Sequence, residues 1–173
     1  MPPPHDAAGS ARRFLAAAAV GGIVAGIVST LVQLILWLLF TDALPDILWR
    51  DARLTAAVVL GPGVLPPPAT FDWLAMAVAS FVHFGLSLAY GIAFCAVARR
   101  LRWRRPAVTG ALLGLVLYAV NLYGFTWLFP WFAAARDWIT LAAHAAFGAS
   151  ATATCRLMLR RWPGRNGRSA PMS

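Results

Sequence analysis

Four long stretches without a charged residue constrain this chain most strongly. They cover residues 14–40, 73–98, 107–129 and 138–155, and the fourth extends to 159 if Arg156 snorkels to the membrane surface. A helix needs about 20 apolar residues to cross a bilayer. Backbone groups in lipid must bond within their own segment, so each stretch is expected to be helical. The sequence therefore predicts an all-α, integral membrane four-helix bundle.

The composition agrees with a membrane protein. The chain is 60% hydrophobic and 12% charged, whereas soluble domains average about 25% charged residues. We expect one membrane domain at 12–162, with spans at about 14–40, 73–98, 107–129 and 138–159. The outer loop, 41–72, is predicted to contain a short amphipathic helix lying on the membrane. The polar ends, 1–11 and 163–173, are expected to be disordered cytoplasmic tails.

Arginines set the predicted orientation. Twelve of the 15 arginines lie before the first span, between the second and third, or after the fourth. By the positive-inside rule, both termini are cytoplasmic. The expected partners of these arginines are the lipid bilayer and its anionic headgroups, not nucleic acid. The residues assigned to this role are Arg99, Arg100, Arg102, Arg104, Arg105, Arg160 and Arg161.

The chain also contains an internal repeat. The first and third spans each open with a G-x-x-x-G pair, and a carboxamide follows on the same predicted helix face. The second and fourth spans each place a histidine sixteen residues before an arginine pair. This pattern predicts two similar helical hairpins in parallel repeat. The glycines, Gly22, Gly26, Gly110 and Gly114, are expected to let helices pack closely.

A layer of polar side chains is predicted inside the membrane. Its members are His83, His144, Asn121 and Gln33, with Ser87 and Tyr90 on the following turns of the His83 face. Such residues are costly in lipid and usually face a bundle interior or a cavity. These six residues are the candidate site.

Three interpretations of this layer remain open. In the first, the polar groups hydrogen-bond across helices in a structural or stress-related protein. In the second, they line a proton or small-solute path of a channel or carrier, which with four spans would need a homo-oligomer. In the third, His83 and His144 ligate a metal or haem. No soluble-enzyme motif is present, so a non-enzymatic protein with no cofactor or metal is expected.

The two cysteines, Cys95 and Cys155, lie shortly before cytoplasmic arginine pairs. The compartment on that side is normally reducing. We therefore expect both to be buried, unpaired thiols that behave as small hydrophobic residues.

One stretch carries a family resemblance. The run His83-x3-Ser87-x7-Cys95-Ala-Val97-Ala98, followed by a basic loop and "GALLG" at 110–114, resembles the YagU-like family of small bacterial inner-membrane proteins. The resemblance implies a multi-pass protein of the bacterial inner membrane. That family has no assigned chemistry, so the resemblance implies no substrate, and the outer loop here is shorter than expected for it.

Overall fold

The computed structural model describes residues 4–100 and 105–161, with side chains from residue 8 onward. These residues form helices and connecting turns, and the described ranges contain no strand. The long helices are α1 (Pro4–Phe40), α2 (Asp46–Leu60), α3 (Trp73–Arg100), α4 (Pro106–Ala119) and α5 (Trp138–Arg161). Short helical turns are η1 (Pro62–Val64), η2 (Val120–Gly124), η3 (Phe125–Trp127) and η4 (Pro130–Ala135). The predicted all-α class is confirmed.

Three helical stretches are long and apolar enough to cross a membrane. They are Ala8–Phe40, Trp73–Arg100 and Pro106–Trp127. The fourth predicted span forms α5, which is long enough, but its histidine, serine and threonine residues make it less apolar than the other three. The membrane character of the chain is thus supported by three helices of the described part. Helix α1 begins at Pro4, so it includes residues 4–11 of the segment that was expected to be a disordered tail.

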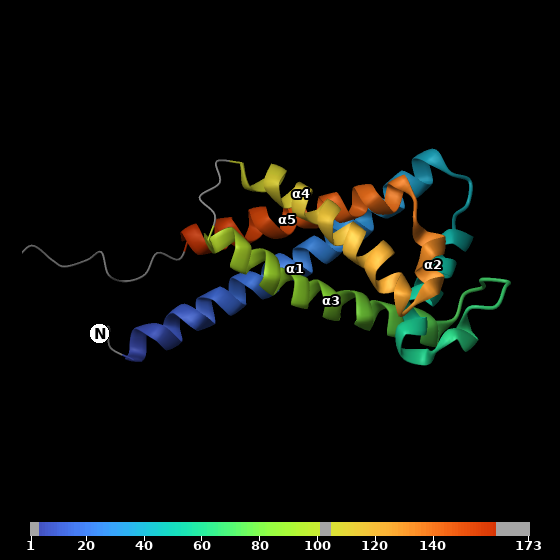
Figure 1. Ribbon diagram of the computed structural model, residues 1–173, viewed down its shortest axis with the longest axis horizontal. Helices are drawn as coiled ribbons and strands as arrows, with labels where there is room; N and C mark the ends of the chain where they lie inside the picture. The colour runs from blue at the N-terminus through green and yellow to red at the C-terminus, as the bar shows by residue number, and fades with distance from the viewer. Residues whose placement is uncertain (1–3, 101–104, 162–173) are drawn as a thin grey trace, which may run out of the picture.

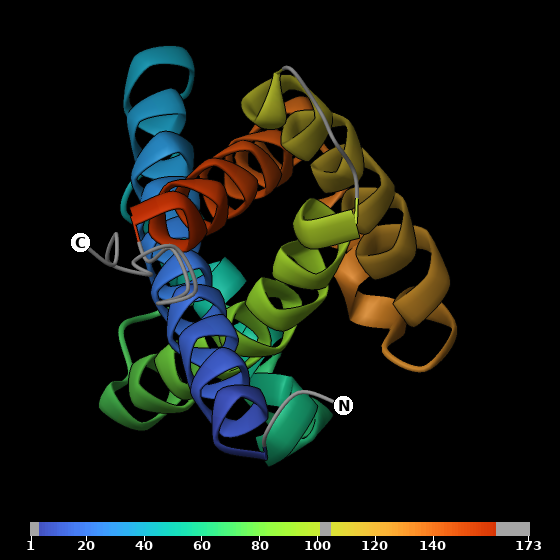
Figure 2. The same cartoon turned by 90° about the vertical axis from the view of Figure 1, so that its left-hand side faces the viewer.

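The helix α5 lies between two partners. It packs along α1 on one side and along α4 on the other, and α1 also packs against α3. The first turns of α1 and α4 and the last turns of α3 and α5 lie at one end of the molecule, with α2 at the opposite end (Figure 1). Figure 2 shows the first end from outside, with α1, α3 and α5 crossing one another at clear angles.

Two aspartates begin the helices that start at the α2 end. The Asp72 carboxylate accepts a hydrogen bond from the backbone N–H of Ala75 at 2.7 Å, and Asp137 accepts one from Thr140 at 2.7 Å. A side-chain oxygen in this position satisfies one of the free N–H groups of the first turn. These caps define where α3 and α5 start.

The outer loop folds back onto the long helices. Its helix α2 packs against α3 and buries Leu54 together with three alanines. The Trp131 indole donates a hydrogen bond to the carbonyl of Leu54 at 2.9 Å, and Arg53 donates to the carbonyls of Val64 and Thr70. A helix was predicted at this place, and the structure packs part of its apolar face against α3.

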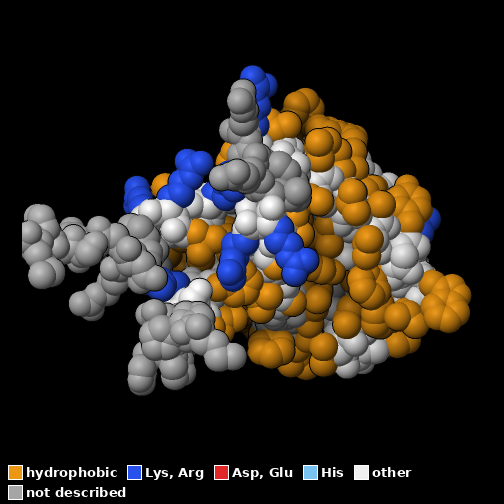
Figure 3. Space-filling model, turned by 60° about the vertical axis from the view of Figure 1, so that its left-hand side comes forward, with side chains coloured by type: hydrophobic (Ala, Val, Ile, Leu, Met, Phe, Trp, Pro, Cys, Tyr) orange, Lys and Arg blue, Asp and Glu red, His pale blue; other side chains and the backbone are white. Residues whose placement is uncertain are grey.

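Most described arginines gather at the end opposite α2. Figure 3 shows their side chains clustered there, while hydrophobic side chains cover much of the remaining surface in that view. Among them, Arg99 stacks over the ring of Phe14 at 5.0 Å, and Arg156 donates a hydrogen bond to the carbonyl of Ala98. Arg100, Arg105, Arg160 and Arg161 are exposed. Arg102, Arg104 and the predicted tail at 163–173 lie outside the described residues.

Candidate functional site: a cavity between the helices

All six residues of the predicted polar layer line one cavity. Its volume is about 570 Å³, within the range of small-molecule sites. Helices α1, α2, α3, α4 and α5 and the turns η2, η3 and η4 all contribute to its wall. The members of the predicted layer that line it are Gln33, His83, Ser87, Tyr90, Asn121 and His144. Residues from four separate helical stretches therefore surround one space.

One side of the cavity is built on a chain of hydrogen bonds. The Tyr90 hydroxyl donates to Oδ1 of Asn121 at 2.7 Å, and Nδ2 of Asn121 lies 3.4 Å from Nε2 of His144. Nδ1 of His144 is 2.8 Å from the carbonyl of Thr140. Because a carbonyl can only accept, Nδ1 carries the ring proton and Nε2 accepts from Asn121. This chain links α3, η2 and α5 with matched donors and acceptors.

The other histidine, His83, carries its ring proton on the opposite nitrogen, Nε2. Nε2 of His83 lies 3.3 Å from the carbonyl of Gly26 and 3.3 Å from Oγ1 of Thr30. The Thr30 hydroxyl itself donates to Gly26 at 2.9 Å, so the proton between the ring and these oxygens belongs to Nε2. The Nδ1 atom of a neutral His83 is then an acceptor. Ser87 donates to the carbonyl of His83 in its own helix at 2.7 Å.

Asn121 reaches the cavity from a widened helical turn. After Ala119 the α-helical pattern gives way to the π-helical turn η2, Val120–Gly124. Such turns often occur at functional sites because they change the direction of a side chain. The sequence predicted a continuous span at 107–129, and the pattern gave no signal for this change.

The four predicted packing glycines lie at two helix crossings. Gly22 and Gly26 meet Ser87 where α1 crosses α3, and a methyl group on either glycine would overlap it. Gly110 and Gly114 meet the carbonyls of Gly148 and His144 where α4 crosses α5, with no room for a methyl group. Close packing is thus the role the structure gives these glycines.

The residue that sequence analysis missed is Asp51. It comes from α2 and lines the cavity, and its Oδ2 accepts a hydrogen bond from Nε2 of Gln33 at 3.4 Å. Its Oδ1 receives Nε and Nη2 of Arg50 at 2.9 and 2.7 Å. Burial raises the pKa of the Asp51 carboxyl, against a smaller lowering by Arg50. The sequence feature that could have identified Asp51 is its position on the apolar face of the predicted loop helix.

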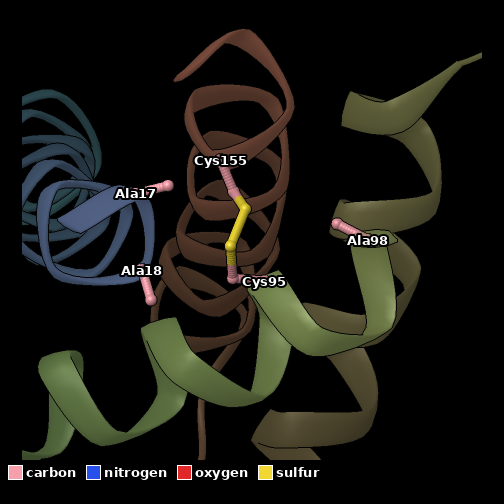
Figure 4. Close-up of a cluster of buried hydrophobic side chains, with 5 residues drawn as sticks. All are labelled: Ala17, Ala18, Cys95, Ala98 and Cys155. Carbon is pink, nitrogen blue, oxygen red and sulfur yellow. A yellow bond between two sulfur atoms is a disulfide. The ribbon is translucent and has the colours of Figure 1, made fainter. Parts of the chain in front are cut away.

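The cysteines form a disulfide, which corrects the prediction of unpaired thiols. Cys95 of α3 and Cys155 of α5 are bonded, with Cα atoms 5.6 Å apart (Figure 4). Both are buried in a cluster with Ala17, Ala18 and Ala98. Cys95 lies four residues before one arginine pair and Cys155 five residues before the other, which places the two cysteines at nearly the same level, a condition for this bond. The prediction was wrong because it considered only the reducing character of the compartment and not the distance between the two cysteines.

A metal centre would require a different arrangement of His144. The described residues contain no group of three or more His, Cys, Asp or Glu side chains placed to hold a metal ion. Both ring nitrogens of His144 have partners, in Thr140 and Asn121. Ligation by both histidines would need the Asn121 bond to break.

Comparisons of this chain with protein-family models, curated proteins and solved structures found no match.

Proposed function

We propose that this protein is a multi-pass membrane protein whose cavity carries a proton or a small solute. The observation that supports this is the cavity itself: all six polar side chains line a space of about 570 Å³ whose wall is otherwise mostly apolar. Polar groups in a membrane interior usually face such a space when they serve transport. This favours the path interpretation of the layer.

The proposal includes the arrangement in the membrane. The helices α1, α3, α4 and α5 are the four spans, as two hairpins in parallel repeat, with both termini in the cytoplasm of a bacterium. The equivalent glycine crossings of α1 on α3 and of α4 on α5 support the repeat. The chain acts as a homo-oligomer without enzymatic activity, and its similarity to the YagU-like family depends on His83, Ser87 and Cys95.

A second candidate function rests on the hydrogen bonds. The chain from Tyr90 through Asn121 to His144 joins separate helices, as a purely structural or stress-related protein would use it. Such bonds contribute about 0.6 kcal/mol each in membrane proteins. In that case the histidines affect stability and have no role in transport.

The experiment that separates the two measures proton flux into proteoliposomes with a trapped pH dye. The wild type is compared with the double variant His83→Ala/His144→Ala. The matched control is Phe81→Ala/Leu141→Ala, which truncates exposed residues of the same two helices that do not line the cavity.

We expect flux with the wild type and the control, and its loss in the double histidine variant. Flux that equals empty liposomes for all three proteins, with a lower melting temperature of the histidine variant alone, would favour the structural candidate and contradict the transport proposal.

A further inference from the structure

The wall of the cavity contains a single charged residue in the part of the chain described. Among its lining residues that residue is Asp51, while Arg50, its ion-pair partner, is not part of the wall. The remaining lining residues are apolar, aromatic, histidine or uncharged polar. A ligand that enters therefore meets one carboxylate and no guanidinium.

The two oxygens of this carboxylate are used unequally. Oδ1 receives two hydrogen bonds from Arg50, and Oδ2 has one long bond, 3.4 Å, from Gln33. A carboxylate offers about four lone-pair sites, so Oδ2 can accept a further donor. Gln33, the partner of this less occupied oxygen, lines the cavity together with Asp51.

Two buried polar atoms of the cavity wall lack a partner within the described structure. They are Nε1 of Trp37 and Oγ1 of Thr140, in residues that are 2% and 6% exposed. A buried polar group without a hydrogen bond costs about 1–3 kcal/mol. The indole N–H requires an acceptor, which a ligand oxygen would supply. Residues of the cavity wall thus include a hydrogen-bond donor without a partner, in Trp37, and a carboxylate oxygen that can accept, in Asp51.

Aromatic rings supply the remainder of the site. Phe129, Phe132 and Phe147 line the cavity together with Tyr90. Such faces attract organic cations and pack against apolar ligand bodies. Among the side chains that the structure describes, the end of the molecule with α2 holds five aspartates and three arginines, so a cation is attracted toward this end.

We infer that the cavity binds an amphiphilic organic amine in its ammonium form, with the charge on Oδ2 of Asp51. An oxygen of the amine accepts from Trp37, and its aromatic body lies against the phenylalanines. This inference rests on the proposed function, since it names the ligand class of the same cavity.

The test uses the full-length protein in detergent and equilibrium dialysis with propranolol. This probe joins an ammonium, a hydroxyl and ether oxygen, and a naphthyl body. Its N-acetyl derivative keeps the body and lacks the charge. Empty micelles are subtracted. The variants are Asp51→Asn, Trp37→Phe and, as the control, Asp42→Asn, which removes an exposed carboxylate outside the cavity wall.

We expect propranolol to bind wild type and Asp42→Asn equally, Asp51→Asn at least tenfold more weakly and Trp37→Phe several-fold more weakly, with the N-acetyl derivative binding poorly throughout. The Trp37→Phe variant keeps the aromatic ring, so it tests the site even if Asp51→Asn fails to fold.

Equal binding of both probes, or binding unchanged by Asp51→Asn, would overturn the amine inference and leave a ligand cavity in place. Absence of binding by either probe would also overturn it. The proton-flux experiment decides the proposed function separately from these outcomes.

Discussion

The side chain of Asn121 joins Tyr90 of α3 to His144 of α5. It accepts from the tyrosine hydroxyl at 2.7 Å and approaches Nε2 of the histidine at 3.4 Å. The carbonyl of Thr140 fixes the ring proton of His144 on the other nitrogen. Tyr90, Asn121 and His144 therefore form an ordered arrangement in which donors face acceptors.

The variant Asn121→Ala removes both of these contacts. At about 0.6 kcal/mol for each intramembrane hydrogen bond, it should lower the free energy of unfolding by about 1 kcal/mol. Thermal unfolding in detergent measures this. The control Ser150→Ala removes only bonds within one helix, to Ala146 and Phe147. Equal melting temperatures for the two variants would show that the layer adds no cross-helix stability.

Alanine substitutions at Gly148 and Gly85 should change the stability of the fold in opposite directions. Gly148→Ala forces the backbones of α4 and α5 apart, because its Cβ would overlap the carbonyl of Gly110. Overpacking of this kind costs about 1–3 kcal/mol. Gly85→Ala, with nothing within 4 Å of its Cβ, should stabilise α3 by about 0.5–1 kcal/mol. Melting temperatures that change in the same direction would contradict the close crossing.

The disulfide should protect both cysteines. We expect no mass shift with a polyethylene-glycol maleimide on the unfolded, unreduced protein, and two added groups after reduction. The bond joins residues separated by 60 positions, so its loss in Cys95→Ser/Cys155→Ser should destabilise the fold by about 4 kcal/mol. Labelling without reduction would show that the thiols are unpaired, as the compartment alone suggested.

The stability of the protein should depend on pH through Asp51. Burial raises the pKa of this carboxyl above its usual value of 3.8, more than Arg50 lowers it. A raised pKa means that the folded state favours the protonated carboxyl. The stabilisation that Asp51 gives the fold is therefore fully present below pH 3.8 and is lost as the pH rises through the pKa of the folded state.

Asp51→Asn should therefore gain stability relative to the wild type as the pH rises from 4 to 7, measured by melting at each pH. Asp42→Asn, an exposed carboxylate, serves as the comparison. A constant difference between Asp51→Asn and the wild type across this range would contradict the burial of Asp51.

The polar layer could be predicted because depth follows from helical rise. His83 and His144 stand at the same distance from arginine pairs, and a fixed rise per residue converts that distance into a shared level. The glycine crossings followed from the repeat of small residues. Both predictions use distances along single helices, which the sequence contains directly.

The remaining features depend on contacts between helices. Asp51 reaches the cavity because α2 folds back onto α3, and no local pattern determines that packing. The disulfide depends on how closely α3 approaches α5 near Cys95. The π-helical turn at Asn121 arises within a stretch without charged residues, where the sequence pattern predicted a continuous helix.

If the polar layer lines a space that water reaches, thiol accessibility in proteoliposomes should reveal it. Single cysteines are introduced in neighbouring pairs: Ser80→Cys and Leu117→Cys in the cavity wall, Phe81→Cys and Val116→Cys on exposed surfaces outside it. The probe is the small cationic reagent trimethylammonium-ethyl methanethiosulfonate, which needs water around a thiolate to react. We predict reaction of the two cavity positions and none at their neighbours. Cavity positions as unreactive as their neighbours would contradict the account.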